Sequence, residues 1–155
     1  NMTQPLPLQT HEWDLRFMSL ARHIAGWSKD PSTKVGAVLV DNERRVLGLG
    51  YNGFPRWVKD LADRLDDRET KYSLVVHAEL NAILNCAHRP VGSTLYVWPL
   101  YPCSECGKAI IQAGIARVVG LATGEERWQK SNSIAFAMFT EADIRVTLIN
   151  PEEVR

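Results

Sequence analysis

The order of the predicted elements indicates an α/β fold with a mixed five-stranded sheet. Two observations predict it. First, two short apolar runs, Val35–Val40 and Val46–Tyr51, flank the turn sequence Asp41-Asn42-Glu43-Arg44, which is typical of a β-hairpin. Second, strand-like segments then alternate with segments of helical periodicity, as in parallel strands joined by helices. With 155 residues and 45% hydrophobic composition, the chain is long enough for one domain with a substantial core.

The predicted domain begins with one amphipathic helix. Apolar residues recur at helical spacing from about Thr10 to Trp27, behind a sequence that resembles a capping box. We expect residues 1–10 to form a flexible N-terminal arm, residues 11–150 a single domain and residues 151–155 a C-terminal tail.

The segment after the hairpin is the hardest to assign. Residues Arg56–Lys71 are strongly charged and allow only a short helix around Lys59–Leu65. A connection of this length is often functional. The elements predicted beyond it are helix Ala78–Ala87, strand Thr94–Trp98, helix Ser104–Gln112, strand Arg117–Leu121, a helix with its centre at Ile134–Phe139 and strand Ile144–Ile149.

Two short motifs carry the chemistry, His77-Ala78-Glu79 and Pro102-Cys103-Ser104-Glu105-Cys106. One imidazole and two thiolates hold zinc tetrahedrally and leave the fourth position for water, as catalytic zinc sites do. Both motifs open predicted helices, so Cys103 and Cys106 share a helix face. The helix N-termini favour thiolate over thiol. We therefore predict one zinc ion per chain, bound by His77, Cys103 and Cys106, with Glu79 free to move protons.

A C-x-x-C sequence alone is a redox or structural-zinc motif about as often as it is a catalytic one. A closed structural site would need a fourth protein ligand. The only other cysteine, Cys86, follows His77 by nine residues on the same predicted helix, which separates them by roughly 13 Å. This distance favours a catalytic site.

Longer sequence runs indicate a family. They are Ser28-Lys29-Asp30-Pro31, Gly50–Pro55, Lys71-Tyr72 leading into His77–Ile83, and Pro102–Ile115. On these runs the chain resembles the cytidine and deoxycytidylate deaminase superfamily, and within it the deoxycytidylate (dCMP) deaminases. The resemblance implies a three-layer α/β/α sandwich and zinc-dependent hydrolysis of dCMP to dUMP and ammonia.

Two alternatives stay open at this point. One is a deaminase of another nucleobase, nucleoside or modified nucleotide. Trp98-Pro99 bears on it, because this stretch before the cysteines is one residue longer than is typical of the family and abuts the expected substrate ring. The other is a non-catalytic zinc or nucleotide-binding module, in which the unligated carboxylate of Glu79 would have no use.

The substrate contacts divide into two groups. By resemblance, the backbone N–H of Ala78 is expected to bind the pyrimidine O2, and Asn52 to bind the sugar. No glycine-rich phosphate cradle is visible, so the phosphate candidates are polar and aromatic residues near the first and fourth strands: Lys29, Ser32, Lys34, Arg127 and Trp128.

Charge and composition exclude several partners. The formal net charge is zero and both signs are interspersed, which speaks against polymeric nucleic acid as the ligand and favours a small nucleotide. No apolar run reaches the roughly 20 residues of a membrane span. Three cysteines fit a reducing compartment, so we expect a cytoplasmic protein. The apolar run Ala109-Ile110-Ile111 and the loop residues Phe54 and Trp57 predict a homo-oligomer, and the resemblance implies a dimer or hexamer.

Overall fold

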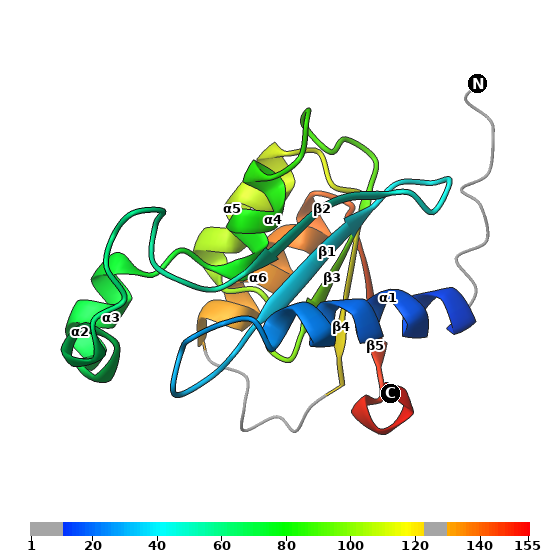
Figure 1. Ribbon diagram of the computed structural model, residues 1–155. Coiled ribbons are helices and arrows are strands. Elements are labelled where there is room, and N and C mark those ends of the chain that lie inside the picture. Colours follow the sequence, from blue (N-terminus) through cyan, green and yellow to red (C-terminus); the bar gives the residue numbers. More distant parts are fainter. Residues whose placement is uncertain (1–10, 123–129) are drawn as a thin grey trace.

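The computed structural model describes residues 11–122 and 130–155, so the predicted arm and Trp128 lie outside the described residues. Its strands are β1 (Gly36–Val40), β2 (Val46–Tyr51), β3 (Thr94–Trp98), β4 (Arg117–Leu121) and β5 (Arg145–Ile149). They form one sheet in the order β2-β1-β3-β4-β5 (Figure 1). β1 is antiparallel to β2 and β3, whereas β4 is parallel to β3 and β5. The predicted mixed five-stranded sheet is confirmed.

Helices cover both faces of this sheet. They are α1 (His11–Ala25), α2 (Ala62–Asp66), α3 (Arg68–Leu74), α4 (Ala78–Leu84), α5 (Ser104–Gln112) and α6 (Lys130–Glu141), followed by a 3₁₀ turn at Pro151–Glu153. α1 lies on one face, α4, α5 and α6 lie on the other, and α2 and α3 project beyond one end (Figure 1). This is the three-layer α/β/α arrangement. None of the described helices is both long enough and apolar enough to span a bilayer.

The alternation of side chains along the strands divides the core in two. On β1, Ala37 and Leu39 pack toward α4 and α5, whereas Val38 and Val40 pack toward α1. All five residues of β1 and of β4 are buried. These interior strands are therefore buried on both faces, as expected for strands that helices cover on both sides.

Glycines allow helices to approach the sheet closely at two places. A Cβ on Gly36 would lie 2.1 Å from the carbonyl oxygen of Ala21 in α1. A Cβ on Gly50 of β2 would lie 2.3 Å from the backbone nitrogen of Ala82 in α4. Larger residues would push these helices outward. Gly50 thus fixes the depth of α4, the helix that begins at the His77 motif.

The charged connection differs most from its prediction. It contains two short helices, and the second, α3, was not predicted. Asp67 caps α3, because its side chain accepts a hydrogen bond from the backbone N–H of Thr70 at 3.1 Å. Lys71, a charged residue, is the buried residue of this helix, so no apolar stripe marks α3 in the sequence.

Two other segments end differently from their predictions. α4 stops at Leu84, three residues before the predicted end, and the side chain of its C-cap residue Asn85 donates to the carbonyl oxygen of Leu49 in β2 at 2.8 Å. The residues expected to form a C-terminal tail pack against α1, with Val154 only 5% exposed in the core. The hydroxyl of Ser19 donates to the backbone carbonyl oxygen of Arg155.

Candidate active site

The two chemical motifs meet where α4 and α5 begin. His77 is the N-cap residue of α4 and Cys103 is the N-cap residue of α5, with Cys106 within the first turn of the same helix. The Nδ1 atom of His77 lies 3.5 Å from Sγ of Cys103 and 3.3 Å from Sγ of Cys106. We call these three residues the metal corner. They are positioned to bind one metal ion, as predicted.

Zinc fits this donor set. With Zn–N of about 2.0–2.1 Å and Zn–S of about 2.3 Å, a tetrahedral site places nitrogen and sulfur donors roughly 3.5 Å apart. The two observed separations agree with that edge length. Within residues 11–122 and 130–155, no fourth His, Cys, Asp or Glu joins the group. Three protein ligands leave one coordination position for water or substrate, which is the arrangement of catalytic zinc sites.

The donors of the metal corner already influence one another's protonation. The hydrogen bond with Cys106 lowers the pKa of Cys103 to about 3, and the same contact raises the pKa of Cys106. The hydrogen bond with Cys103 also raises the pKa of His77. A thiolate at the start of the nine-residue helix α5 is further stabilised by the positive end of the helix dipole. A half-buried negative charge of this kind is what a bound cation neutralises.

Glu79 lies beside the metal corner in the first turn of α4 and is only 5% exposed. Burial raises the pKa of its carboxyl group to about 7. The carboxylate is not a member of the donor group, although the same cavity is lined by Glu79 and by His77. An unligated, buried carboxyl group next to a metal site has the position that proton transfer requires.

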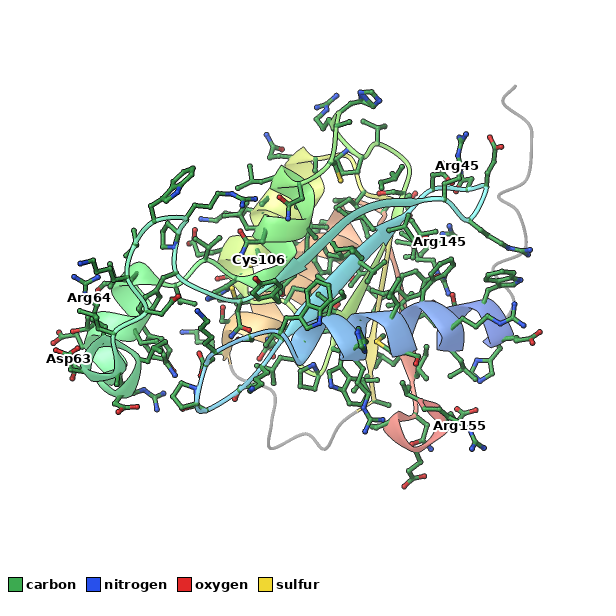
Figure 2. The ribbon with its side chains drawn as sticks, viewed as in Figure 1. Arg45, Asp63, Arg64, Cys106, Arg145 and Arg155 are labelled. Atoms are coloured by element: carbon green, nitrogen blue, oxygen red, sulfur yellow. The ribbon has the colours of Figure 1, made fainter. Side chains whose placement is uncertain are left out.

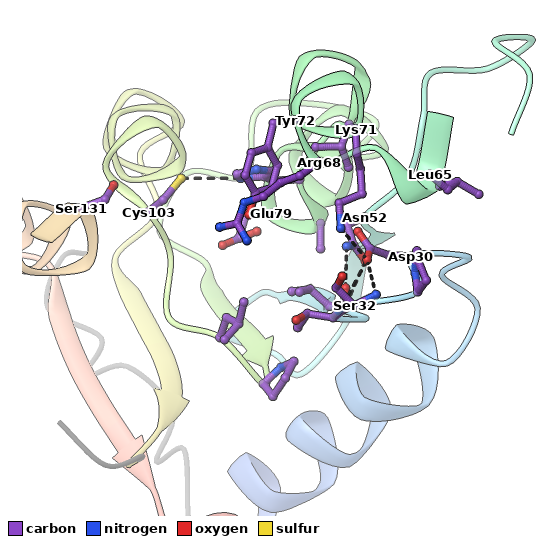
Figure 3. A pocket seen from close by; sticks show the side chains of 18 of the residues that line it. Asp30, Ser32, Asn52, Leu65, Arg68, Lys71, Tyr72, Glu79, Cys103 and Ser131 are labelled. Atoms are coloured by element: carbon purple, nitrogen blue, oxygen red, sulfur yellow. Dashed lines mark hydrogen bonds and ion pairs between the residues drawn. The ribbon is translucent and has the colours of Figure 1, made fainter. Parts of the chain in front are cut away.

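That cavity has a volume of about 1110 Å³, which is ample for a nucleotide. Figure 3 shows its two sides, with Cys103 and Ser131 at one end and Asp30, Ser32 and Asn52 at the other. Pro99 also lines it, on the stretch that follows β3. The expectation that this longer stretch abuts the substrate space agrees with its position.

Asn52, the predicted sugar contact, lines the cavity directly after β2 and is 7% exposed. Its Oδ1 atom accepts a hydrogen bond from the backbone N–H of Val35 at 2.9 Å, and its Nδ2 donates to the carbonyl oxygen of Thr33 at 3.0 Å. The side chain therefore holds the loop before β1 in place. The second N–H of its amide has no recorded partner among the described residues.

A buried ion pair stands next to Asn52. Nζ of Lys71 in α3 lies 3.1 Å from Oδ1 of Asp30, and both side chains are less than a tenth exposed (8% and 9%). The carboxylate of Asp30 also accepts the backbone N–H groups of Ser32 and Thr33. Burial alone would raise the pKa of Asp30, but these hydrogen bonds and Lys71 together hold it below its usual value. We call Asp30, Asn52 and Lys71 the loop wall.

Of the other predicted substrate residues, the structure places some in the cavity and one outside it. Ala78 and Ser32 line the cavity. Lys29 does not line it and instead forms an exposed ion pair with Asp60, with 3.0 Å between Nζ and Oδ2. Trp128 lies outside the described residues.

Several lining residues were not predicted as site residues. Those from α3 and α6 are Arg68, Lys71, Tyr72, Ser131 and Asn132. The run Lys71-Tyr72 belongs to the motifs that indicated the family, but nothing in its local pattern assigns it a role. Ser131 accepts the backbone N–H of Ser104 at 2.8 Å, so α6 helps to fix the start of α5.

Comparison with known proteins agrees with this site. Residues 11–122 match the sequence model described as the cytidine and deoxycytidylate deaminase zinc-binding region. An uncharacterized deaminase of the luxG 3′ region of Aliivibrio fischeri is 40% identical over 139 residues, covering 88% of this chain and 92% of that protein. Mouse deoxycytidylate deaminase is 46% identical over 117 residues, covering 70% of this chain and 64% of the mouse protein, which is less than two thirds of its length.

The fold comparison points the same way. The dCMP deaminase of cyanophage S-TIM5, solved in complex with dCMP and dUMP, superposes with a TM-score of 0.73 at 24% identity, covering 91% of this chain and 99% of that one. At this identity the similarity concerns the fold. The matched zinc-binding region spans the metal corner and Glu79. The chain therefore belongs to the cytidine and deoxycytidylate deaminase family.

Proposed function

We propose that this chain is a zinc-dependent deoxycytidylate deaminase that hydrolyses dCMP to dUMP and ammonia. The observation that carries the proposal is the buried, unligated Glu79 beside a three-donor metal corner, in a cavity of about 1110 Å³. The identity of 46% with mouse deoxycytidylate deaminase supports the choice of substrate.

The reaction exchanges the amino group on C4 of cytosine for the oxygen of water. Zinc bound by the metal corner supplies a Lewis acid that lowers the pKa of water toward about 7. Glu79 accepts one proton from the attacking water and delivers it to N3 of the ring. It then carries the second proton to the amino group, which leaves as ammonia. Positioned proton transfer of this type typically contributes about 10²–10⁴-fold to the rate.

Other residues of the cavity orient the substrate. Ala78 is fully buried at the first position of α4, where a backbone N–H has no partner within its own helix and is free to bind the pyrimidine O2. The remaining N–H of Asn52 donates to a sugar hydroxyl. Ser32, on the far side of the cavity, offers its hydroxyl to the phosphate end of the nucleotide.

We also propose a homo-oligomer in a reducing, cytoplasmic compartment. Several large apolar side chains are exposed: Trp57 at 94%, Leu84 at 68%, Tyr72 at 58% and Trp27 at 55%. Large apolar side chains exposed to this extent support an interface with a second copy of the chain. The three free cysteines fit reducing conditions. Light scattering at micromolar concentration is expected to give a multiple of 17.5 kDa, and a monomeric mass would contradict the oligomer.

An ammonia-release screen tests the substrate. The panel contains cytidine, deoxycytidine, CMP, dCMP, dCTP, 5-substituted dCMP, and adenine and guanine nucleotides. We expect dCMP to give the highest kcat/KM. An apolar pocket wall distinguishes substrates that differ by one methylene by only about 1–3 kcal/mol. Because Pro99 lines the cavity, 5-substituted dCMP is also an informative competitor of dCMP. A nucleoside or purine preferred over dCMP by more than about tenfold would contradict the proposal.

A further inference from the structure

Among the residues that the structure describes, two cationic side chains outside the metal corner line the cavity, Arg68 and Lys71. Their surroundings differ. Lys71 is buried and paired with Asp30 at 3.1 Å, so its charge is already neutralised inside the protein. A buried lysine in such a pair cannot turn to a ligand without leaving an unpaired carboxylate behind, which is costly. Lys71 is therefore unsuited to bind a further anion.

Arg68 has no such partner. In the described ranges it forms no ion pair, although the carboxyl groups of Asp66 and Glu79 line the same cavity. Its guanidinium carbon lies 5.0 Å from the ring centroid of Tyr72, one turn further along α3. Stacking on an aromatic ring restricts the guanidinium group while leaving its N–H donors available. Figure 3 shows Arg68 extending from α3 into the cavity beside Tyr72.

A guanidinium group with free donors matches a phosphate group, because its planar fork of N–H groups can donate two parallel hydrogen bonds to two of the phosphate oxygens. Resting on the proposed dCMP deaminase function, we propose that Arg68 binds the 5′-phosphate of the substrate and thereby makes the enzyme prefer nucleotides over nucleosides. Lys29, paired with Asp60 outside the cavity, is not available for this task. Ser32 remains as a neutral partner in the same cavity.

The matched control is Arg64, a half-buried arginine on the preceding helix α2. Figure 2 shows Arg64 and Asp63 at the outer end of α2, well away from Cys106. Arg64 does not line the cavity, and its guanidinium donates to the backbone carbonyl of Lys59 at 3.2 Å. Arg64→Gln therefore removes the same charge from the same region without touching the cavity.

The test compares a nucleotide with the nucleoside that lacks its phosphate. Calorimetric titration of the zinc-loaded protein with dUMP and with deoxyuridine gives Kd values, and turnover of dCMP and deoxycytidine gives kcat/KM. Arg68→Gln is expected to weaken dUMP binding and to lower kcat/KM for dCMP by about 10- to 100-fold, chiefly through KM. Deoxyuridine binding is expected to change by less than about twofold. Arg68→Lys should restore part of the loss, because it keeps the charge but not the fork.

Three outcomes would overturn the inference, and the third also overturns the proposed function. If the wild type prefers dCMP and Arg68→Gln keeps that preference, or if Arg64→Gln loses as much, Arg68 does not bind the phosphate and the proposed function stands. If the wild type turns over deoxycytidine as well as dCMP and binds dUMP no better than deoxyuridine, the nucleotide assignment fails together with the role of Arg68.

Discussion

His77 and Cys103 of the metal corner line the same cavity as the loop wall, but the two regions have different tasks. In the metal corner, the imidazole nitrogen and the two sulfur atoms lie within 4.8 Å of one another, where together they can bind a cation. In the loop wall, Lys71 and Asp30 neutralise each other's charge. The side-chain amide of Asn52 forms hydrogen bonds with the backbone of Thr33 and Val35. The metal corner is arranged to bind a metal ion, whereas the loop wall stabilises the loops that form the cavity. Changes in the two regions should therefore affect different measurements.

The largest expected effect is a loss of turnover without a change in zinc binding or stability. Glu79→Gln removes the proton shuttle but keeps the shape of the side chain, so turnover should fall by at least about 10³-fold, equivalent to roughly 4 kcal/mol of activation free energy. Zinc content and melting temperature should stay close to those of the wild type. The matched control is Glu105→Gln, which changes an exposed glutamate on α5 that pairs with Lys108. Retention of turnover in Glu79→Gln would make this carboxylate a bystander.

A change in the loop wall should act on stability first. Lys71→Met leaves the carboxylate of Asp30 buried without its cation, which typically costs about 3–5 kcal/mol in the free energy of unfolding. Chemical denaturation of the zinc-loaded protein measures it. Adding Asp30→Asn should recover part of the loss, since the remaining amide carries no charge. Arg16→Ala, which breaks the exposed pair with Glu12, is the control and should cost no more than about 1 kcal/mol.

These two regions also differ in how well they could be predicted from the sequence. The metal corner could be predicted because zinc is bound by His and Cys side chains, and few other sites use these residues at this spacing. The same local periodicity predicted β2, β3, β4 and α5 at their observed bounds. The ion pair of the loop wall could not be predicted, because Asp30 and Lys71 are ordinary surface residue types that are separated by 41 positions in the chain. α3 was missed for the same reason, since its buried residue is that lysine.

Asn52→Ala tests the comparison between the two regions, because Asn52 is expected both to stabilise the loop before β1 and to bind the sugar of the substrate. Its removal leaves the backbone N–H of Val35 without its acceptor in a buried position, which costs about 1–3 kcal/mol of stability. It also removes the proposed donor to the sugar, so KM for dCMP should rise beyond what the loss of stability explains. Activity measured well below the melting temperature separates the two effects. An unchanged KM would leave Asn52 with a purely structural role.

The pH dependence of stability is a finer test of the loop wall. The pKa of Asp30 lies below its ordinary value of 3.8 in the folded protein. The carboxylate therefore contributes stability that is fully present above the unfolded-state pKa and is lost as pH falls through the lower folded-state pKa. The difference in unfolding free energy between the wild type and Asp30→Asn should be constant near neutral pH and should shrink in acid. A difference that is independent of pH down to pH 3 would contradict this role for the Asp30 charge.

The smallest expected effect concerns the cysteine that lies outside the metal corner. Cys86 follows the end of α4, where its Sγ atom lies 3.3 Å from the carbonyl oxygen of Ala82, and burial raises the pKa of its thiol. A thiol in this state is a poor metal ligand, because the thiolate is the form that binds. Cys86→Ser should therefore keep one zinc ion per chain, measured by atomic absorption on purified protein. Cys106→Ser, the same substitution inside the metal corner, should lose most of the zinc. Loss of zinc from Cys86→Ser, with Cys106→Ser still loaded, would reverse the assignment of ligands.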